Sequence, residues 1–181
     1  GVNLGDDVDI ISTVTQDLLK RRGSQLTKYT GLKSSVIQSE QLKNAGVVNV
    51  DRAVAAIDQE IAKLSPMRSK EVDQVLDRLR DWRGSLLGET TVKAPNGKMI
   101  TVNEGQSLQT IELLRKQLGE SFEAADLGSI RQLGKDSLKN IYGPLREDMR
   151  SFIQNFGAKN DIKRFDTSNA RLSELAGELD N

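Results

Sequence analysis

The chain changes from a β pattern to a helical pattern within the stretch Thr101–Leu118, TVNEGQSLQTIELLRKQL, and this change constrains the fold more than any other feature. The helical part has apolar residues at three- and four-residue steps, which share one helix face: Leu108, Ile111, Leu114 and Leu118. We expect Asn103 or Ser107 to cap its start, because either side chain accepts a hydrogen bond from a first-turn N–H. We expect Arg115 and Lys116 in its last turn, where positive charge suits the helix dipole.

The N-terminal residues 6–44 predict one long helix or two joined helices. An apolar stripe opens this region at helical spacing: Val8, Ile11, Val14 and Leu18. The basic triplet Lys20-Arg21-Arg22 then precedes Gly23, an order that is typical of a helix C-terminus.

Two cleaner helices follow. The first, which we expect Asn49 to cap, has a heptad-like seam: Val50, Val54, Ile57, Ile61 and Leu64. Ser65 and Pro66 predict an N-cap and a first helical position for the second helix. That helix has its own apolar face: Val72, Val75, Leu76, Leu79, Trp82 and Leu86. The short connection predicts an antiparallel helical hairpin, whose shared core Trp82 closes at one end.

Residues 89–103 alternate with a period of two and predict a β-hairpin. The turn signal is Pro95-Asn96-Gly97, because Pro fixes φ while Asn and Gly tolerate positive φ. A lone two-stranded hairpin is marginal in water, so it must lean on helices or pair with another chain.

Two more helices are expected in the C-terminal part. Residues 121–156 keep one apolar face across Pro144, which predicts a kink or a cap-and-restart: Leu138, Ile141, Leu145, Met149, Phe152 and Phe156. The last helix, about 158–179, also has a single seam: Ala158, Ile162, Phe165, Asn169, Leu172, Ala176 and Leu179. Asn169 is its one polar member, either a buried amide that sets the register or a half-exposed residue.

These patterns predict a mainly α fold: a helical bundle of about five or six helices with one inserted two-stranded β-hairpin. The expected parts are residues 1–88, a long helix plus a helical hairpin, residues 89–103, the β-hairpin, and residues 104–181, the C-terminal helices. We expect one compact domain. The chain starts at Gly1 without Met, so Gly1 is either a tag remnant or the start of a segment of a longer protein.

The composition excludes several function classes. The 181 residues include no cysteine and no histidine, which removes disulfides, thiolate zinc sites, cysteine nucleophiles and the usual proton-transfer group near neutral pH. The 26 basic and 26 acidic residues cancel, so the net charge gives no support to nucleic-acid binding, although a local basic patch stays open. No apolar run approaches the roughly 20 residues that span a bilayer.

Three groups of residues resemble chemical sites, and each has a simpler interpretation. The segment Gly128–Asp136 has five residues between its glycines instead of the four of a phosphate-binding loop, and Asp136 replaces the magnesium-binding hydroxyl. The carboxylates on the helix of residues 71–83 alternate with arginines and predict a solvated face: Glu71, Asp73, Asp77 and Asp81, with Arg78, Arg80 and Arg83. The basic cluster Lys20-Arg21-Arg22 and a second cluster, Lys159 with Lys163-Arg164, lack a nucleic-acid-binding signature. We therefore expect no catalytic residues, no cofactor and no metal.

Three passages carry a family resemblance: MITVNEGQSLQTIELLRKQLGE, YGPLREDMRSFIQNFG and KRFDTSNARLSEL. In this order they resemble helical modules of the large internal or DNA-ejection virion proteins of tailed bacteriophages. The matching residues are Leu108, Leu113, Leu114, Arg115, Asp148, Met149, Phe152, Asn169 and Ala170. The resemblance covers the C-terminal half and implies a non-enzymatic module of a longer virion protein that acts in assembly or genome delivery.

The function that we expect is therefore a structural or assembly module that packs against itself or against neighbouring virion proteins. The alternative is a helical adaptor or scaffold domain of a cellular protein that binds a partner helix. The expected location is the virion under the first reading and the cytoplasm under the second.

Overall fold

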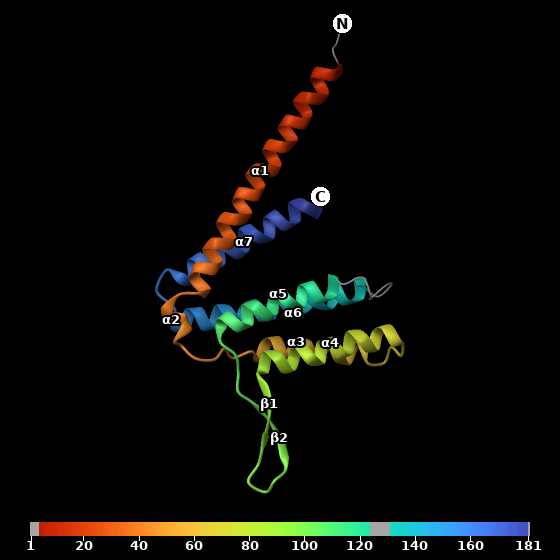
Figure 1. Ribbon diagram of the computed structural model, residues 1–181, viewed down its shortest axis with the longest axis vertical. Coiled ribbons are helices and arrows are strands. Elements are labelled where there is room, and N and C mark those ends of the chain that lie inside the picture. Colours follow the sequence, from red (N-terminus) through yellow and green to blue (C-terminus); the bar gives the residue numbers. More distant parts are fainter. Residues whose placement is uncertain (1–3, 124–130, 181) are drawn as a thin grey trace. The chain divides into compact units, whose positions relative to one another are not determined.

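The structure of the chain is a computed structural model that describes residues 4–123 and 131–180, with side chains for residues 10–120 and 132–176. Within these residues it has seven helices and one two-stranded sheet, which confirms the mainly α fold with an inserted β-hairpin (Figure 1). The elements in chain order are α1 (Leu4–Ile37), α2 (Glu40–Lys43), α3 (Asp51–Leu64), α4 (Lys70–Leu87), β1 (Glu89–Lys93), β2 (Met99–Asn103), α5 (Leu108–Glu123), α6 (Arg131–Phe156) and α7 (Asp161–Asp180).

The chain divides into two compact units. Residues 1–36 and 160–181 form the first, in which α7 packs against the later half of α1, and residues 37–159 form the second. The boundaries do not coincide with the expected division at residues 88 and 103, because α7 belongs with α1 and the hairpin belongs with the helices on either side of it.

The second unit is a ring of four helices. α3 packs against α4 and α6, and α5 packs against the same two helices, while the short α2 contacts α5 and α6. In Figure 1, α3 and α4 overlap in one layer and α5 and α6 in the other. All four helices contribute side chains to its core, and the following are fully buried: Ile57, Leu64, Leu79, Leu86, Leu108, Ile111, Ile141 and Leu145. The apolar faces expected for α4 and α6 lie in this core, except that Phe156 is 47% exposed. Of the seam expected for α3, Val54 and Ile61 are only half-buried, and Ala53 and Ala56 are buried instead. Pro144 lies inside α6.

The connection between α3 and α4 differs from the prediction. Ser65 ends α3, where its hydroxyl donates to the Ile61 carbonyl at 2.6 Å, and Pro66 follows in the turn. The cap of α4 is Ser69, whose Oγ accepts the Val72 N–H at 3.1 Å. Both serines have a hydroxyl that can accept a first-turn N–H, so local sequence does not distinguish Ser69 from Ser65 as a cap.

The start of α5 confirms one of its two expected caps. Ser107 Oγ accepts the Thr110 N–H at 3.2 Å, whereas Asn103 is the last residue of β2. α5 continues to Glu123, so Arg115 and Lys116 lie in its middle instead of its last turn. Arg115 there makes a bidentate ion pair with Glu112, one turn earlier, at 3.0 and 2.7 Å.

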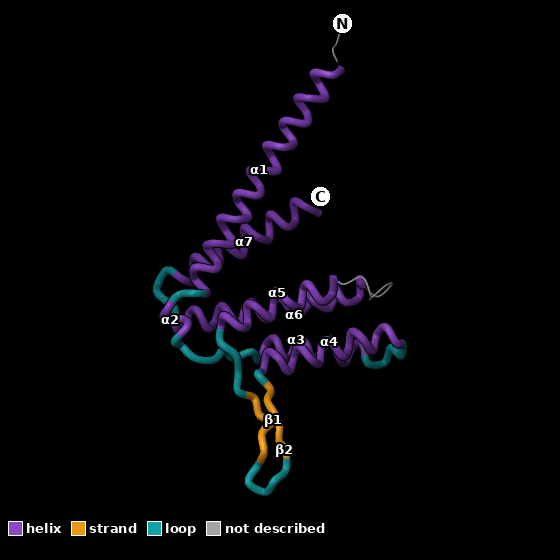
Figure 2. The backbone as a smooth tube through the Cα atoms, viewed as in Figure 1, coloured by secondary structure: helices purple, strands orange, loops and turns teal. Residues whose placement is uncertain are grey.

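The β-hairpin forms as predicted, with Val92 opposite Ile100 and Lys93 opposite Met99 (Figure 2). The Ala94 N–H donates to the Lys98 carbonyl at 2.8 Å across the turn, and Gly97 has φ +83°. Every residue of β1 is exposed, and Val102 is the one half-buried residue of β2. The hairpin's contact with the described helices is confined to its base, where Glu89 lies 3.9 Å from Arg83 of α4.

In the first unit, α1 is one continuous helix that runs through Gly23. The triplet Lys20-Arg21-Arg22 consequently lies in mid-helix and does not mark a C-terminus, because a glycine costs a helix only about 1 kcal/mol. α7 runs antiparallel to α1: Arg22 donates to the Leu175 carbonyl at 2.8 Å, and Lys33 lies 5.8 Å from the Phe165 ring. The side chains of Val8 and Leu179, which the sequence placed on these seams, lie outside the described residues.

A pair of glycine variants tests how the hairpin joins the bundle. Gly88 (φ +63°) caps α4, and a Cβ there would lie 2.5 Å from the Gly105 carbonyl oxygen, whereas a Cβ on Gly97 would meet nothing within 4 Å. We expect Gly97→Ala to lower the free energy of unfolding by about 1 kcal/mol, the usual cost of a left-handed non-glycine residue. Gly88→Ala adds a backbone clash, so its loss in urea unfolding should be clearly larger. Equal losses would show that the Gly88–Gly105 contact does not constrain the fold.

Candidate functional site

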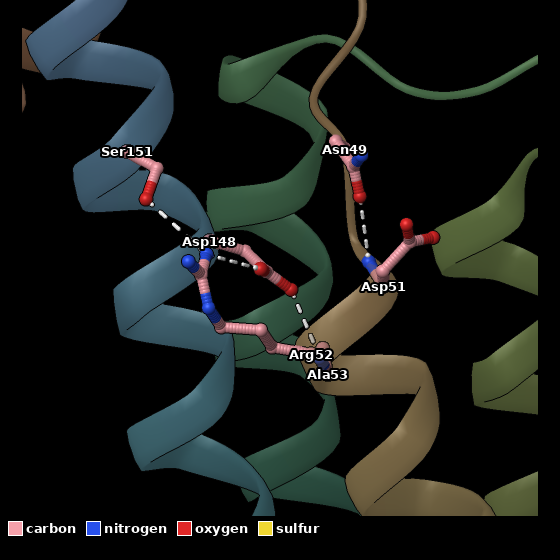
Figure 3. A network of polar contacts seen from close by, with 6 residues as sticks. All are labelled: Asn49, Asp51, Arg52, Ala53, Asp148 and Ser151. Carbon is pink, nitrogen blue, oxygen red and sulfur yellow. Dashed lines mark hydrogen bonds and ion pairs between the residues drawn. The ribbon is translucent and has the colours of Figure 1, made fainter.

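A cluster of polar contacts lies at the start of α3, against α6. Asp148 of α6 is only 3% exposed and points at the first turn of α3 (Figure 3). Its Oδ2 accepts the Ala53 N–H at 2.9 Å, and its Oδ1 accepts a hydrogen bond from Arg52 Nη1 at 3.2 Å. The same guanidinium nitrogen also donates to Ser151 Oγ at 3.2 Å. One carboxylate thus binds both the backbone and a side chain of a helix 95 residues away.

This cluster supplies a hydrogen-bond acceptor that the N-cap residue of α3 lacks. The N-cap residue of α3 is Val50, which has no side chain able to accept a hydrogen bond. Asn49 Oδ1 accepts the Asp51 N–H at 2.9 Å, close to the capping role predicted for it, and Asp148 accepts the N–H two residues later. Free N–H groups in the first turn of a helix need such acceptors, and a carboxylate also suits the positive end of the dipole.

Burial and hydrogen bonding act on Asp148 in opposite directions. Removal from water raises the pKa of its carboxyl group above the ordinary value, and this effect outweighs the Ala53 N–H and the Arg52 guanidinium, which lower it. Arg52 itself keeps more than half of its side chain in solvent, so it offsets the burial of the carboxylate only in part.

A cleft of about 710 Å³ opens beside this cluster, and its walls include Val47, Asn49, Arg52, Phe152 and Phe156. Both oxygens of Asp148 are used by α3, so the carboxylate is not presented to the cleft as a free base. No set of three acidic residues in the part of the chain described here is close enough to hold a metal ion. The arrangement fits a structural clamp between α3 and α6 and offers no nucleophile with an adjacent base.

A second buried carboxylate joins the same two helices. Glu60 of α3 is 5% exposed; Ser137 donates to its Oε2 at 3.0 Å and Asn140 to its Oε1 at 2.6 Å. Sequence reasoning missed both clamps, because their partners are about 80 and 95 residues away. Asp148 was singled out only within the virion-protein resemblance, and nothing in its neighbourhood identified it as a cap.

The candidate sites named from sequence do not come together. Gly134, Lys135 and Asp136 lie inside α6, where Asp136 accepts a hydrogen bond from Gln132, and Gly128 lies outside the described residues. The carboxylates of α4 are all exposed, as expected of a solvated face: Glu71, Asp73, Asp77 and Asp81. The basic residues Lys20, Arg21, Lys159, Lys163 and Arg164 are exposed as well.

Asn169 lies between the two expected alternatives. The residue is half-buried, and its Nδ2 is buried without a hydrogen-bond partner among the described residues. Among the described residues, Arg22 Nε is the other buried side-chain nitrogen without a hydrogen-bond partner, and Arg22 lies on the helix that α7 packs against.

An uncovered apolar surface lies on α1, and we call it the α1 stripe. Its five side chains are 53–65% exposed within ten residues of one helix: Ile10, Ile11, Val14, Leu18 and Leu19. The spacing of Ile11, Val14 and Leu18 predicted an apolar helix face, but not that the face would stay open to solvent. Full burial of a side chain of this size contributes about 1.5–3 kcal/mol.

Comparisons with known proteins add no relative to this description. No family model, no curated protein and no solved structure matches the chain. Among the described helices, none is both long and apolar enough to cross a membrane.

Replacement of Asp148 tests its capping role. Asp148→Ala leaves the buried Ala53 N–H without an acceptor, so we expect the free energy of unfolding to fall by about 1–3 kcal/mol. Asp148→Asn keeps an oxygen at the same place and should lose much less. Urea unfolding of the three proteins at pH 7 gives the comparison. Equal losses of unfolding free energy in the two variants would mean that the charge of Asp148, and not its hydrogen bond to α3, stabilises the fold.

The raised pKa of Asp148 predicts how stability depends on pH. A folded-state pKa above the unfolded one means that the folded protein binds the proton more tightly. The stability that this proton contributes is fully present below the unfolded pKa and is lost as pH rises through the folded pKa. The wild type should therefore gain stability relative to Asp148→Asn as pH falls from about 7 towards about 4, the ordinary aspartate range. Urea unfolding across this range measures the difference, and a relative loss at acidic pH would contradict the burial argument.

Proposed function

We propose that this protein is a non-enzymatic assembly module that associates with further copies of itself. The observation that carries the proposal is the α1 stripe, in which five large aliphatic side chains stay more than half exposed on one helix. Contiguous exposed apolar surface of this kind marks protein–protein contact sites in soluble proteins. A second copy is the natural partner, because each copy brings an identical stripe.

The carboxylates of the described residues also support this proposal. The two buried carboxylates, Asp148 and Glu60, are occupied in joining α3 to α6. The exposed carboxylates of α4 lie on a solvated face. The buried carboxylates of the described residues therefore hold helices together, which suits a scaffold better than an enzyme.

A finer proposal concerns the parent protein. The resemblance carried by residues such as Leu114, Arg115, Asp148 and Phe152 leads us to place this module in an internal or DNA-ejection protein of a tailed-phage virion. Its peptides should then be found by mass spectrometry in purified phage particles from the source of the sequence. Their absence from such particles would remove the virion reading and leave self-association untouched.

Sedimentation velocity over a concentration series tests self-association directly. We expect a reversible shift from monomer to a defined oligomer as concentration rises from about 1 μM to about 1 mM, the range in which modest interfaces form. A protein that stays monomeric throughout would overturn the proposal and favour the alternative of an adaptor that binds a different chain.

A further inference from the structure

We propose that the α1 stripe pairs with the α1 stripe of a second copy, and that the two α1 helices run antiparallel. This inference rests on the proposed assembly function and names its interface, its partner and its orientation. Three properties of α1 carry it: the position of the stripe, the distribution of charge along the helix, and the size of the surface.

The position of the stripe continues a face that already packs against a helix. Arg22, Tyr29 and Lys33 contact α7, and they follow Leu18 at steps of four, seven and four residues. Such steps keep a residue on one side of a helix, so Ile11, Val14 and Leu18 of the α1 stripe and the α7-binding seam are two parts of one face, with Ile10 and Leu19 at its two edges. α7 covers the later part of this face, and a further antiparallel helix would cover the earlier part in the same manner.

Charge is distributed unevenly along the first half of α1. The sequence of the helix has Asp6, Asp7 and Asp9 in its first two turns and Lys20-Arg21-Arg22 about three turns later. Residues 10–19 between them include one charged residue, Asp17. The apolar stripe is thus flanked by an acidic segment on one side and a basic segment on the other.

This distribution selects one orientation. If two copies meet in antiparallel fashion near Val14, the acidic segment of each lies opposite the basic segment of the other, and Ile11 of one copy lies opposite Leu18 of its partner. A parallel pair would instead place like charges opposite each other at both ends, which is unfavourable. The helix dipoles also oppose each other favourably in the antiparallel pair.

The size of the stripe sets the strength of the contact. Five aliphatic side chains per copy lie at the low end of specific interfaces, which bury at least about 1,000 Å² in total. We therefore expect a dissociation constant in the micromolar range, and reversible exchange of subunits.

Substitution of one leucine on the stripe tests the interface, with a matched leucine elsewhere as the control. Leu18 on α1 and Leu113 on α5 are 60% and 54% exposed, so glutamate at either position should leave the fold intact, as circular dichroism can check. In sedimentation velocity of the full chain, Leu18→Glu should raise the dissociation constant by at least about tenfold, whereas Leu113→Glu should not change it. Self-association that survives Leu18→Glu would overturn the pairing while the assembly function stands.

Charge reversal tests the electrostatic argument in the same assay. Lys20→Glu with Arg21→Glu makes both flanks of the stripe acidic, so the dissociation constant should rise by about tenfold or more at low salt. The control is Lys163→Glu with Arg164→Glu, which reverses an equivalent exposed pair on α7. Equal effects of the two double variants would overturn the charge argument.

Cross-linking tests the orientation, because the chain has no cysteine of its own. Ile11→Cys and Leu18→Cys are made separately, mixed in equal amounts and oxidised gently. Antiparallel pairing predicts an excess of the mixed disulfide between the two variants over random pairing. A predominance of disulfides within each single variant would show a parallel pair and overturn the proposed orientation. A wild type that is monomeric at every concentration would overturn the assembly function itself, which is a separate result.

Discussion

Two buried carboxylates hold α3 against α6, and the arrangement of the four-helix unit depends on them. Asp148 of α6 binds the first turn of α3, and Glu60, two turns along α3, binds Ser137 and Asn140 of α6. A slide of α3 along α6 by one turn would disturb the packing of the apolar side chains. A slide here would leave two carboxylates in a dry interior without their donors, which costs several kcal/mol for each unpaired charge. The clamps therefore fix the register of the helix pair around which α4 and α5 complete the ring.

Much of the fold could be predicted from local spacing. The apolar face from Val72 to Leu86 predicted α4, and Pro95-Asn96-Gly97 predicted the hairpin, because both signals act over a few residues. The errors share one cause. Ser65 and Ser69 are equally good caps by sequence, and Gly23 is an acceptable helix end or an acceptable interior residue. Packing elsewhere decides between such alternatives, and a single sequence does not display it.

The candidate functional sites were likewise predictable only where they depend on residues close together in the sequence. The steps between Ile11, Val14 and Leu18 identify an apolar helix face, but which part of that face α7 covers depends on a helix more than 140 positions later. Asp148 is harder still to foresee, since an aspartate in a helix is ordinarily a solvated residue. Its role arises because the N-cap residue of α3 is Val50, whose side chain cannot accept a hydrogen bond.

The hairpin enters and leaves the bundle at a single point. The Gly105 N–H donates to the Leu87 carbonyl at 2.9 Å and the Glu104 N–H to the Gly88 carbonyl at 3.0 Å, so α4 and the segment before α5 already meet without the strands. Closing a loop whose ends are held together depends only weakly on its length. Segments of different length and sequence are therefore interchangeable here at little cost to the packed core of the helices.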